Sequence, residues 1–196
     1  MKITTKIVTA LTLLASLTAC STSPMGVSLA QNEIAKQRMR FLLEAACINE
    51  RTTRSQKRVL DGQGFSTSNA DNGGFTYNDG NSLVFANLSP KEEAFFNDDG
   101  RPNRIEGRAC SVGSPAVSVR DANEIVAQVL APRLVSDTRR LPAVIGVGQS
   151  PNDGGNGYFF QDVAIVVGQG KIDMRAETGE SLSLPMANIT VIRSRR

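Results

Sequence analysis

The C-terminal third of the sequence carries the pattern that most restricts the fold. It holds three β-prone segments with only short glycine-containing breaks between them, at 158–168, 171–176 and 182–193. The first contains a continuous apolar run, 163–167, which is typical of a strand buried on both faces. In the second, Ile172, Met174 and Ala176 alternate with charged residues, as in a strand with one solvated face. Strands joined by such short breaks pair with their neighbours in antiparallel fashion, so we expect a C-terminal β-meander.

Two segments have the periodicity of amphipathic helices. The first, at 32–48, is expected to bury one apolar stripe against the core. The second begins at Ser118, whose spacing to Asp121 resembles an N-terminal capping arrangement. We expect this helix to end before Pro132, because the residue before a proline disfavours helical geometry. The stripe of the first helix comprises Ile34, Ala35, Phe41, Leu42, Ala45, Ala46 and Ile48, and that of the second comprises Ala122, Ile125, Val126, Val129 and Leu130.

The region between the helices is expected to add strands. Residues 51–73 are polar and rich in helix and strand breakers, so no element is predicted there. Two β-prone runs flank the Asp79-Gly80 turn and predict a hairpin, and a third run, 104–112, follows the turn at 97–100. Residues 151–157 read as a flexible loop. The chain is therefore predicted to be α+β, with two main helices packed on an antiparallel sheet that ends in the β-meander; we find no internal repeat.

The N-terminus has the pattern of an export signal. Lys2 and Lys6 precede a short apolar run at 7–17, about half the ~20 residues that a membrane-spanning helix needs. The following residues, Leu17-Thr18-Ala19-Cys20, resemble the lipobox of bacterial lipoproteins. The resemblance implies cleavage before Cys20 and a lipid, such as palmitate, on its sulfur. The alternative is an ordinary signal peptide that is cut after Ala30.

The lipobox resemblance carries implications for domain organisation and location. It divides the chain into a signal peptide (1–19), a lipid-anchored tether (20–32) and a single α+β domain (33–196). It implies a cell-envelope protein held to a membrane through Cys20. Because Ser21 rather than Asp follows the cysteine, the outer membrane, facing the periplasm, is favoured.

Removing the signal also changes the charge of the chain. The mature chain of 177 residues loses two lysines and no acidic residue, so its net charge falls from +3 to +1. That balance gives no reason to expect a nucleic-acid partner. The basic cluster at 193–196 is interpreted as a solvated tail.

The remaining cysteines follow from the same assignment. With Cys20 attached to lipid, only Cys47 and Cys110 are left. A pair of cysteines in an oxidising compartment favours one disulfide bond, which would connect the first helix to the strand at 104–112. The alternative is two separately buried thiols.

The sequence offers little for catalysis or metal binding. It contains no histidine, which excludes Ser-His-Asp and Cys-His catalysis and the usual imidazole zinc sites. Two cysteines are too few for a thiolate zinc site. Five aspartates in Asn/Gly-rich stretches match turn chemistry better than calcium-binding loops; they are Asp71, Asp79, Asp98, Asp99 and Asp153. We therefore predict no catalytic residue, no metal and no cofactor.

Three functions are compatible with this sequence. The first is a non-catalytic envelope component that binds another envelope protein in an assembly or structural role. The second is a periplasm-facing module for a small molecule, lipid or glycan, held between the sheet and the helices. The third is a hydrolase based on carboxylates alone, with Glu92, Glu93, Asp98 and Asp99 as candidates. Glu92 and Glu93 are equally compatible with the first turn of a helix.

Overall fold

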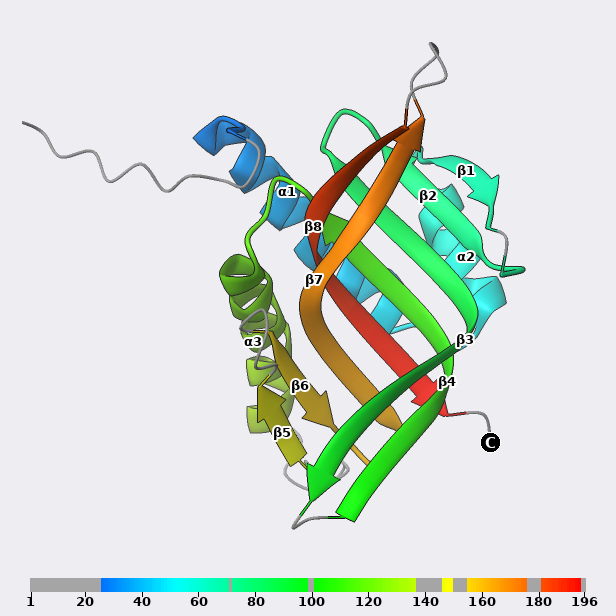
Figure 1. Ribbon diagram of the computed structural model, residues 1–196, viewed down its shortest axis with the longest axis vertical. Helices are drawn as coiled ribbons and strands as arrows, with labels where there is room; N and C mark the ends of the chain where they lie inside the picture. The colour runs from blue at the N-terminus through cyan, green and yellow to red at the C-terminus, as the bar shows by residue number, and fades with distance from the viewer. Residues whose placement is uncertain are drawn as a thin grey trace, which may run out of the picture.

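Eight antiparallel strands form one sheet in the computed structural model, which describes residues 26–70, 72–98, 101–136, 146–149, 155–175 and 181–194. Three helices and a π-helical segment accompany the sheet, so the predicted α+β class is confirmed (Figure 1). The helical elements are α1 (Leu29–Leu42), the π-helix η1 (Leu43–Ile48), α2 (Thr53–Asp61) and α3 (Val119–Ser136). The strands are β1 (Ser66–Asn69), β2 (Phe75–Asp79), β3 (Val84–Asp98), β4 (Arg101–Ser114), β5 (Gly146–Gln149), β6 (Asn156–Phe159), β7 (Val163–Arg175) and β8 (Ser181–Ser194).

The sheet consists of two antiparallel meanders joined side by side. Its strand order is β1-β2-β3-β4-β8-β7-β6-β5. Within each half of the sheet, strands that are consecutive in the chain are therefore also neighbours in the sheet. The two halves meet where β4 pairs with β8, between Gly107 and Ser114 on β4. The C-terminal meander and the hairpin around Asp79-Gly80 are both present as predicted. The long connection between the meanders contains α3.

The first helix begins earlier and faces differently from the prediction. It starts at Leu29 rather than Asn32, because Ser28 and Gln31 form a capping box in which the Gln31 amide donates to Ser28 Oγ at 3.2 Å. Residues 29–32, which the sequence assigns to the tether, are therefore helical. The helix buries Ala35, Met39 and Leu42, whereas two residues of the predicted stripe, Ile34 and Phe41, are exposed.

Helix α2 and strand β1 were not predicted from the polar segment 51–73. Thr52 caps α2, since its hydroxyl accepts from the Ser55 amide at 3.1 Å, and Leu60 reaches the core. The helix is short and mostly polar, so its apolar stripe is too small to detect in the sequence. Every residue of β1 is exposed, which removes the alternation that marks a strand.

Helix α3 has the predicted start and the predicted buried face but not the predicted end. Ser118 Oγ accepts from the Asp121 amide at 3.1 Å and donates to Asp121 Oδ2 at 2.9 Å, and all five residues of the predicted stripe are buried. The helix continues through Pro132 to Ser136. A proline removes the hydrogen bond to the carbonyl four residues earlier. The carbonyl that loses its partner here belongs to Gln128. Because Gln128 is exposed, a water molecule can donate to this carbonyl in place of the N–H that Pro132 lacks.

Three further predictions about the strands are wrong in detail. The glycines at 168 and 170 do not form a turn, because β7 runs through them while pairing continuously with β8. Asn156 and Gly157 belong to β6 rather than to a loop, and residues 151–154 lie outside the described residues. Glu92 and Glu93 lie on β3, next to a register shift between Ser89 and Glu92, and not in a helix.

Two hydrophobic cores lie on opposite faces of the sheet. The larger core is packed between the sheet and the helices, and the run at 163–167 contributes to both cores, as predicted for a strand buried on both faces. The smaller core forms because the sheet curls strongly: β3 reaches β5 at the far edge of the strand order (Figure 1). It comprises Ala94, Ile105, Ala109, Phe159, Ala164 and Ile192. Of the helices in the described residues, none is long and apolar enough to cross a membrane.

Candidate functional site

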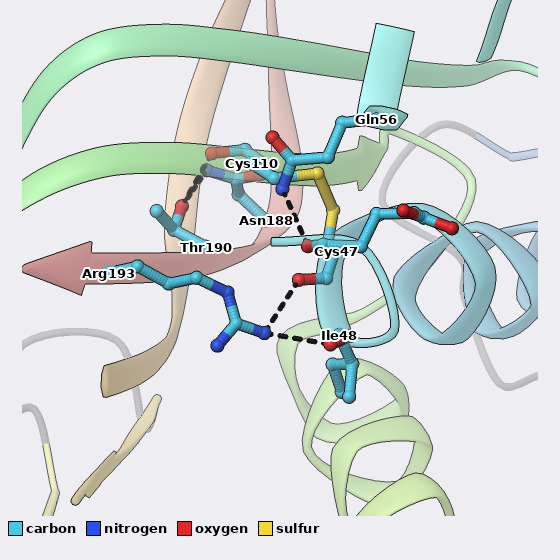
Figure 2. Close-up of a disulfide and its surroundings, with 9 residues drawn as sticks. Cys47, Ile48, Gln56, Cys110, Asn188, Thr190 and Arg193 are labelled. Carbon is cyan, nitrogen blue, oxygen red and sulfur yellow. Dashed lines mark hydrogen bonds between the residues drawn. A yellow bond between two sulfur atoms is a disulfide. The ribbon is translucent and has the colours of Figure 1, made fainter. Parts of the chain in front are cut away.

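The predicted pair of cysteines forms a disulfide bond at the centre of the molecule. Cys47 in η1 and Cys110 in β4 are joined, with their Cα atoms 5.2 Å apart (Figure 2). Both residues are almost completely buried, with relative exposures of 0% and 1%. The bond connects the end of the predicted first helical segment to the predicted strand that carries Cys110, and the structure shows that this strand is paired on both sides. Cys20, the predicted lipidation site, lies outside the described residues.

A partly buried arginine lies beside the disulfide. The Nη2 atom of Arg193, on β8, donates to the carbonyl oxygens of Cys47 at 3.2 Å and Ile48 at 2.8 Å (Figure 2). These carbonyls belong to the last residues of η1, which have no partner within the helix. Burial lowers the pKa of Arg193, and the nearby charge of Arg51 lowers it further. The interpretation of residues 193–196 as a solvated tail is therefore wrong for Arg193; Arg195 and Arg196 lie outside the described residues.

Of the four carboxylates considered for hydrolysis, the structure describes the side chains of Glu92 and Glu93. Glu92 and Glu93 are exposed on β3, and Glu93 forms an ion pair with Arg104 of β4 at 2.7 Å. The side chain of Asp98 and the whole of Asp99 lie outside what the structure describes.

The same part of the β3–β4 hairpin forms a shallow, open depression of about 490 Å³. Its lining includes Phe95, which is 61% exposed, and the Arg104 guanidinium lies 5.8 Å from the centre of the Phe95 ring. Arg104 also pairs with Glu106, which in turn pairs with Lys91 at 3.1 Å. The depression thus places an exposed aromatic ring next to an arginine, two residue types that are enriched at protein interfaces, with charges of both signs around them. Phe95 was not predicted from the sequence, because an isolated exposed phenylalanine has no signature in a strand pattern.

A second exposed apolar surface lies on α1. Leu29 is 74% exposed, Ile34 53% and Phe41 46%. Ile34 and Phe41 were predicted to face the core because they lie in a window rich in apolar residues. The buried residues Ala35, Met39, Leu42 and Ala46 follow the spacing i, i+4, i+7, i+11, which turns Ile34 and Phe41 toward the solvent.

The one aspartate whose turn is fully described behaves as turn chemistry predicts. Asp79 accepts from the Asn81 amide at 3.2 Å and from the Ser82 hydroxyl at 2.7 Å, and it lies 3.5 Å from Arg38 Nε. Burial alone would raise the pKa of Asp79, but these hydrogen bonds and the charge of Arg38 outweigh it and lower the pKa.

Within the described residues, no group of three or more Cys, Asp or Glu side chains is arranged to hold a metal ion. Asp71, Asp99 and Asp153 lie outside them.

The larger core lies between the helices and the sheet, where the ligand-binding alternative places its pocket. On the opposite face, Ser111, Thr190 and Asn188 are connected by hydrogen bonds of 2.9 and 3.1 Å. In the part of the chain that the structure describes, the side-chain oxygens of Asn87 and Asn188 are buried without a hydrogen-bond partner.

No protein-family model, curated protein or solved structure matches this chain. The proposed function therefore rests on the sequence, the fold and the geometry described above.

Proposed function

We propose that this chain is a bacterial envelope lipoprotein, anchored through an acylated Cys20 after removal of residues 1–19, whose single domain binds another envelope protein. In this proposal the protein has no catalytic activity and serves as an assembly or structural component. A disulfide buried in the core supports an oxidising compartment such as the periplasm. The outer membrane is the proposed location.

The observation that carries the partner-binding role is the exposed Phe95 in the depression on the β3–β4 hairpin. Aromatic and arginine side chains dominate the binding energy of protein interfaces, and here Phe95 and Arg104 lie together. The end of β3, where Phe95 lies, is at the other end of the long axis of the molecule from the start of α1 (Figure 1). An anchor that precedes α1 would therefore leave the hairpin directed away from the membrane.

Metabolic labelling tests the anchor. Cells that express the full-length chain are supplied with radiolabelled palmitate, and wild type is compared with Cys20→Ala. We expect the label on the wild type and its loss from the variant. Label that persists in Cys20→Ala would rule out lipidation at this position.

Crosslinking in intact cells tests the partner surface. Tagged wild-type protein should recover a specific envelope protein, and Phe95→Ser should recover at least ~10-fold less of it, because losing a central aromatic residue of an interface costs ~2 kcal/mol or more. Phe41→Ser is the matched control, since it removes an exposed phenylalanine from a different surface. Equal recovery by wild type and Phe95→Ser would contradict the proposal.

A second candidate, binding of a small molecule, lipid or glycan, has one observation in its favour. The buried, unpaired oxygens of Asn87 and Asn188 lie on the sheet face away from the helices, and a ligand could donate hydrogen bonds to them. Thermal-shift screening tests this function, since a ligand that binds only the native state raises the unfolding temperature. The rise should be lost in Asn188→Leu, which cannot accept a hydrogen bond.

A further inference from the structure

Helix α1 presents an apolar stripe to the solvent along its outer side. Ile34 and Phe41 are seven residues apart, which is close to two helical turns, so they share one face. Ala30 lies one turn before Ile34 on the same face, and the exposed Gln37 lies on this face between Ile34 and Phe41. Leu29, the first residue of the helix, is exposed beside Ala30, about 100° farther around the helix. We call Leu29, Ala30, Ile34 and Phe41 the α1 stripe; it extends over about 18 Å of helix.

The charges beside the α1 stripe do not oppose contact with an anionic surface. The two nearby acidic residues are each neutralised by a base: Glu33 pairs with Lys36, and Glu44 pairs with Arg133 at 3.2 Å. Arg40 is exposed, and its guanidinium donates to Gln128 of α3 at 3.3 Å, so it lies on the side of α1 toward α3. The outer side of α1 therefore combines exposed apolar side chains with nearby acidic residues that are paired.

The position of the α1 stripe in the chain indicates what covers it. Only eight residues, 21–28, separate Cys20 from Leu29, so nine steps of ~3.6 Å in an extended chain place the two residues at most about 32 Å apart. A lipid on Cys20 would therefore hold α1 close to the bilayer at all times. The first turns of α1 also extend beyond the edge of the sheet, where a flat surface can reach them (Figure 1).

We propose that the α1 stripe lies on the membrane surface, with Ile34 and Phe41 inserted among the lipid chains at the level of the headgroups. This inference rests on the proposed lipid anchor at Cys20. The anchor raises the effective concentration of the bilayer at α1, so a few apolar side chains are enough for stable contact. A protein partner would need about 800 Å² on each side, more than four side chains on one helix offer. The β3–β4 hairpin then remains free for the partner.

Single tryptophans test this contact directly, because the natural chain contains none. Full-length F41W, I34W and F95W proteins are expressed in bacteria, purified in detergent and reconstituted into vesicles of phosphatidylethanolamine and phosphatidylglycerol. Part of the lipid carries brominated chains, which quench tryptophan at close range. Intact mass shows whether Cys20 carries acyl chains. F95W is the matched control, since Phe95 is at least as exposed as Phe41 and Ile34.

We expect F41W and I34W to emit at shorter wavelength in vesicles and to be quenched about twofold or more, because an interfacial helix buries its apolar face ~5–10 Å deep. F95W should keep the emission of an exposed tryptophan and remain unquenched. If the protein carries acyl chains but F41W and I34W behave like F95W, the anchor stands and the membrane contact is overturned. If the mass shows an unmodified Cys20, the anchor itself fails, and the contact that rests on it fails with it.

Discussion

Removing the Cys47–Cys110 bond should lower the free energy of unfolding by about 4 kcal/mol. The two cysteines are 63 residues apart in the sequence. In the chain-entropy model, closing a loop of this length removes about 14 cal/mol/K of entropy from the unfolded chain, which is about 4.3 kcal/mol at 25 °C. For a chain of this size, the change corresponds to a fall of roughly 8–16 °C in the midpoint of thermal unfolding.

Urea denaturation of three forms separates the crosslink from the packing around it. The oxidised and reduced wild-type proteins differ in the crosslink but retain both sulfur atoms. The Cys47→Ala/Cys110→Ala variant also removes the buried sulfurs, so its further loss measures packing. The reduced form should also show the larger dependence on urea, because its unfolded chain is more expanded. A difference below about 1 kcal/mol between oxidised and reduced wild type would refute the loop-entropy argument.

Three further predictions concern stability, each measured by urea denaturation. Arg193→Met should cost about 1.5–3 kcal/mol, because it removes charged hydrogen bonds to η1; Arg120→Ala, at a side chain that is 88% exposed, should change stability by less than ~0.5 kcal/mol. Gly107→Ala should be strongly destabilising, because its Cβ would lie 1.7 Å from the carbonyl oxygen of Arg193, whereas Gly80→Ala meets no atom within 4 Å and should be tolerated. Asp79→Asn should be less stable than wild type at pH 7. Since the folded pKa of Asp79 is lowered, this difference should disappear as the pH falls below the ordinary value of ~3.9; a constant difference down to pH 2 would contradict it.

The features that the sequence predicts are those carried by local pattern. The apolar run at 163–167 and the alternation at Ile172 and Met174 identify extended structure in both halves of β7, although the sequence predicts two separate strands there. Successive residues of a strand face opposite sides of the sheet, so burial leaves a local pattern in the sequence. The Ser118 cap and the stripe behind it identify the start and the face of α3 for the same reason. The Cys47–Cys110 bond follows from the small number of cysteines rather than from any pattern in space.

The features that the sequence did not predict depend on residues far apart in the chain. Gly168 and Gly170 resemble a turn, but they stay extended because β8 pairs with β7 along its whole length. Arg193 resembles a tail residue until η1 places two carbonyls within its reach. The side of α1 that faces outward depends on how the helix docks, and an apolar window such as 32–48 does not specify that rotation.

The disulfide also determines how this protein responds to a mechanical force. A pull on the chain before Leu29 can unwind α1 and η1 only as far as Cys47, where the load passes through the covalent bond to Cys110. Cys110 lies in β4, which is hydrogen-bonded to β3 on one side and to β8 on the other, so many bonds share the load there. A protein attached at its N-terminus to a moving membrane could thus lose its first helix under tension and keep its sheet intact.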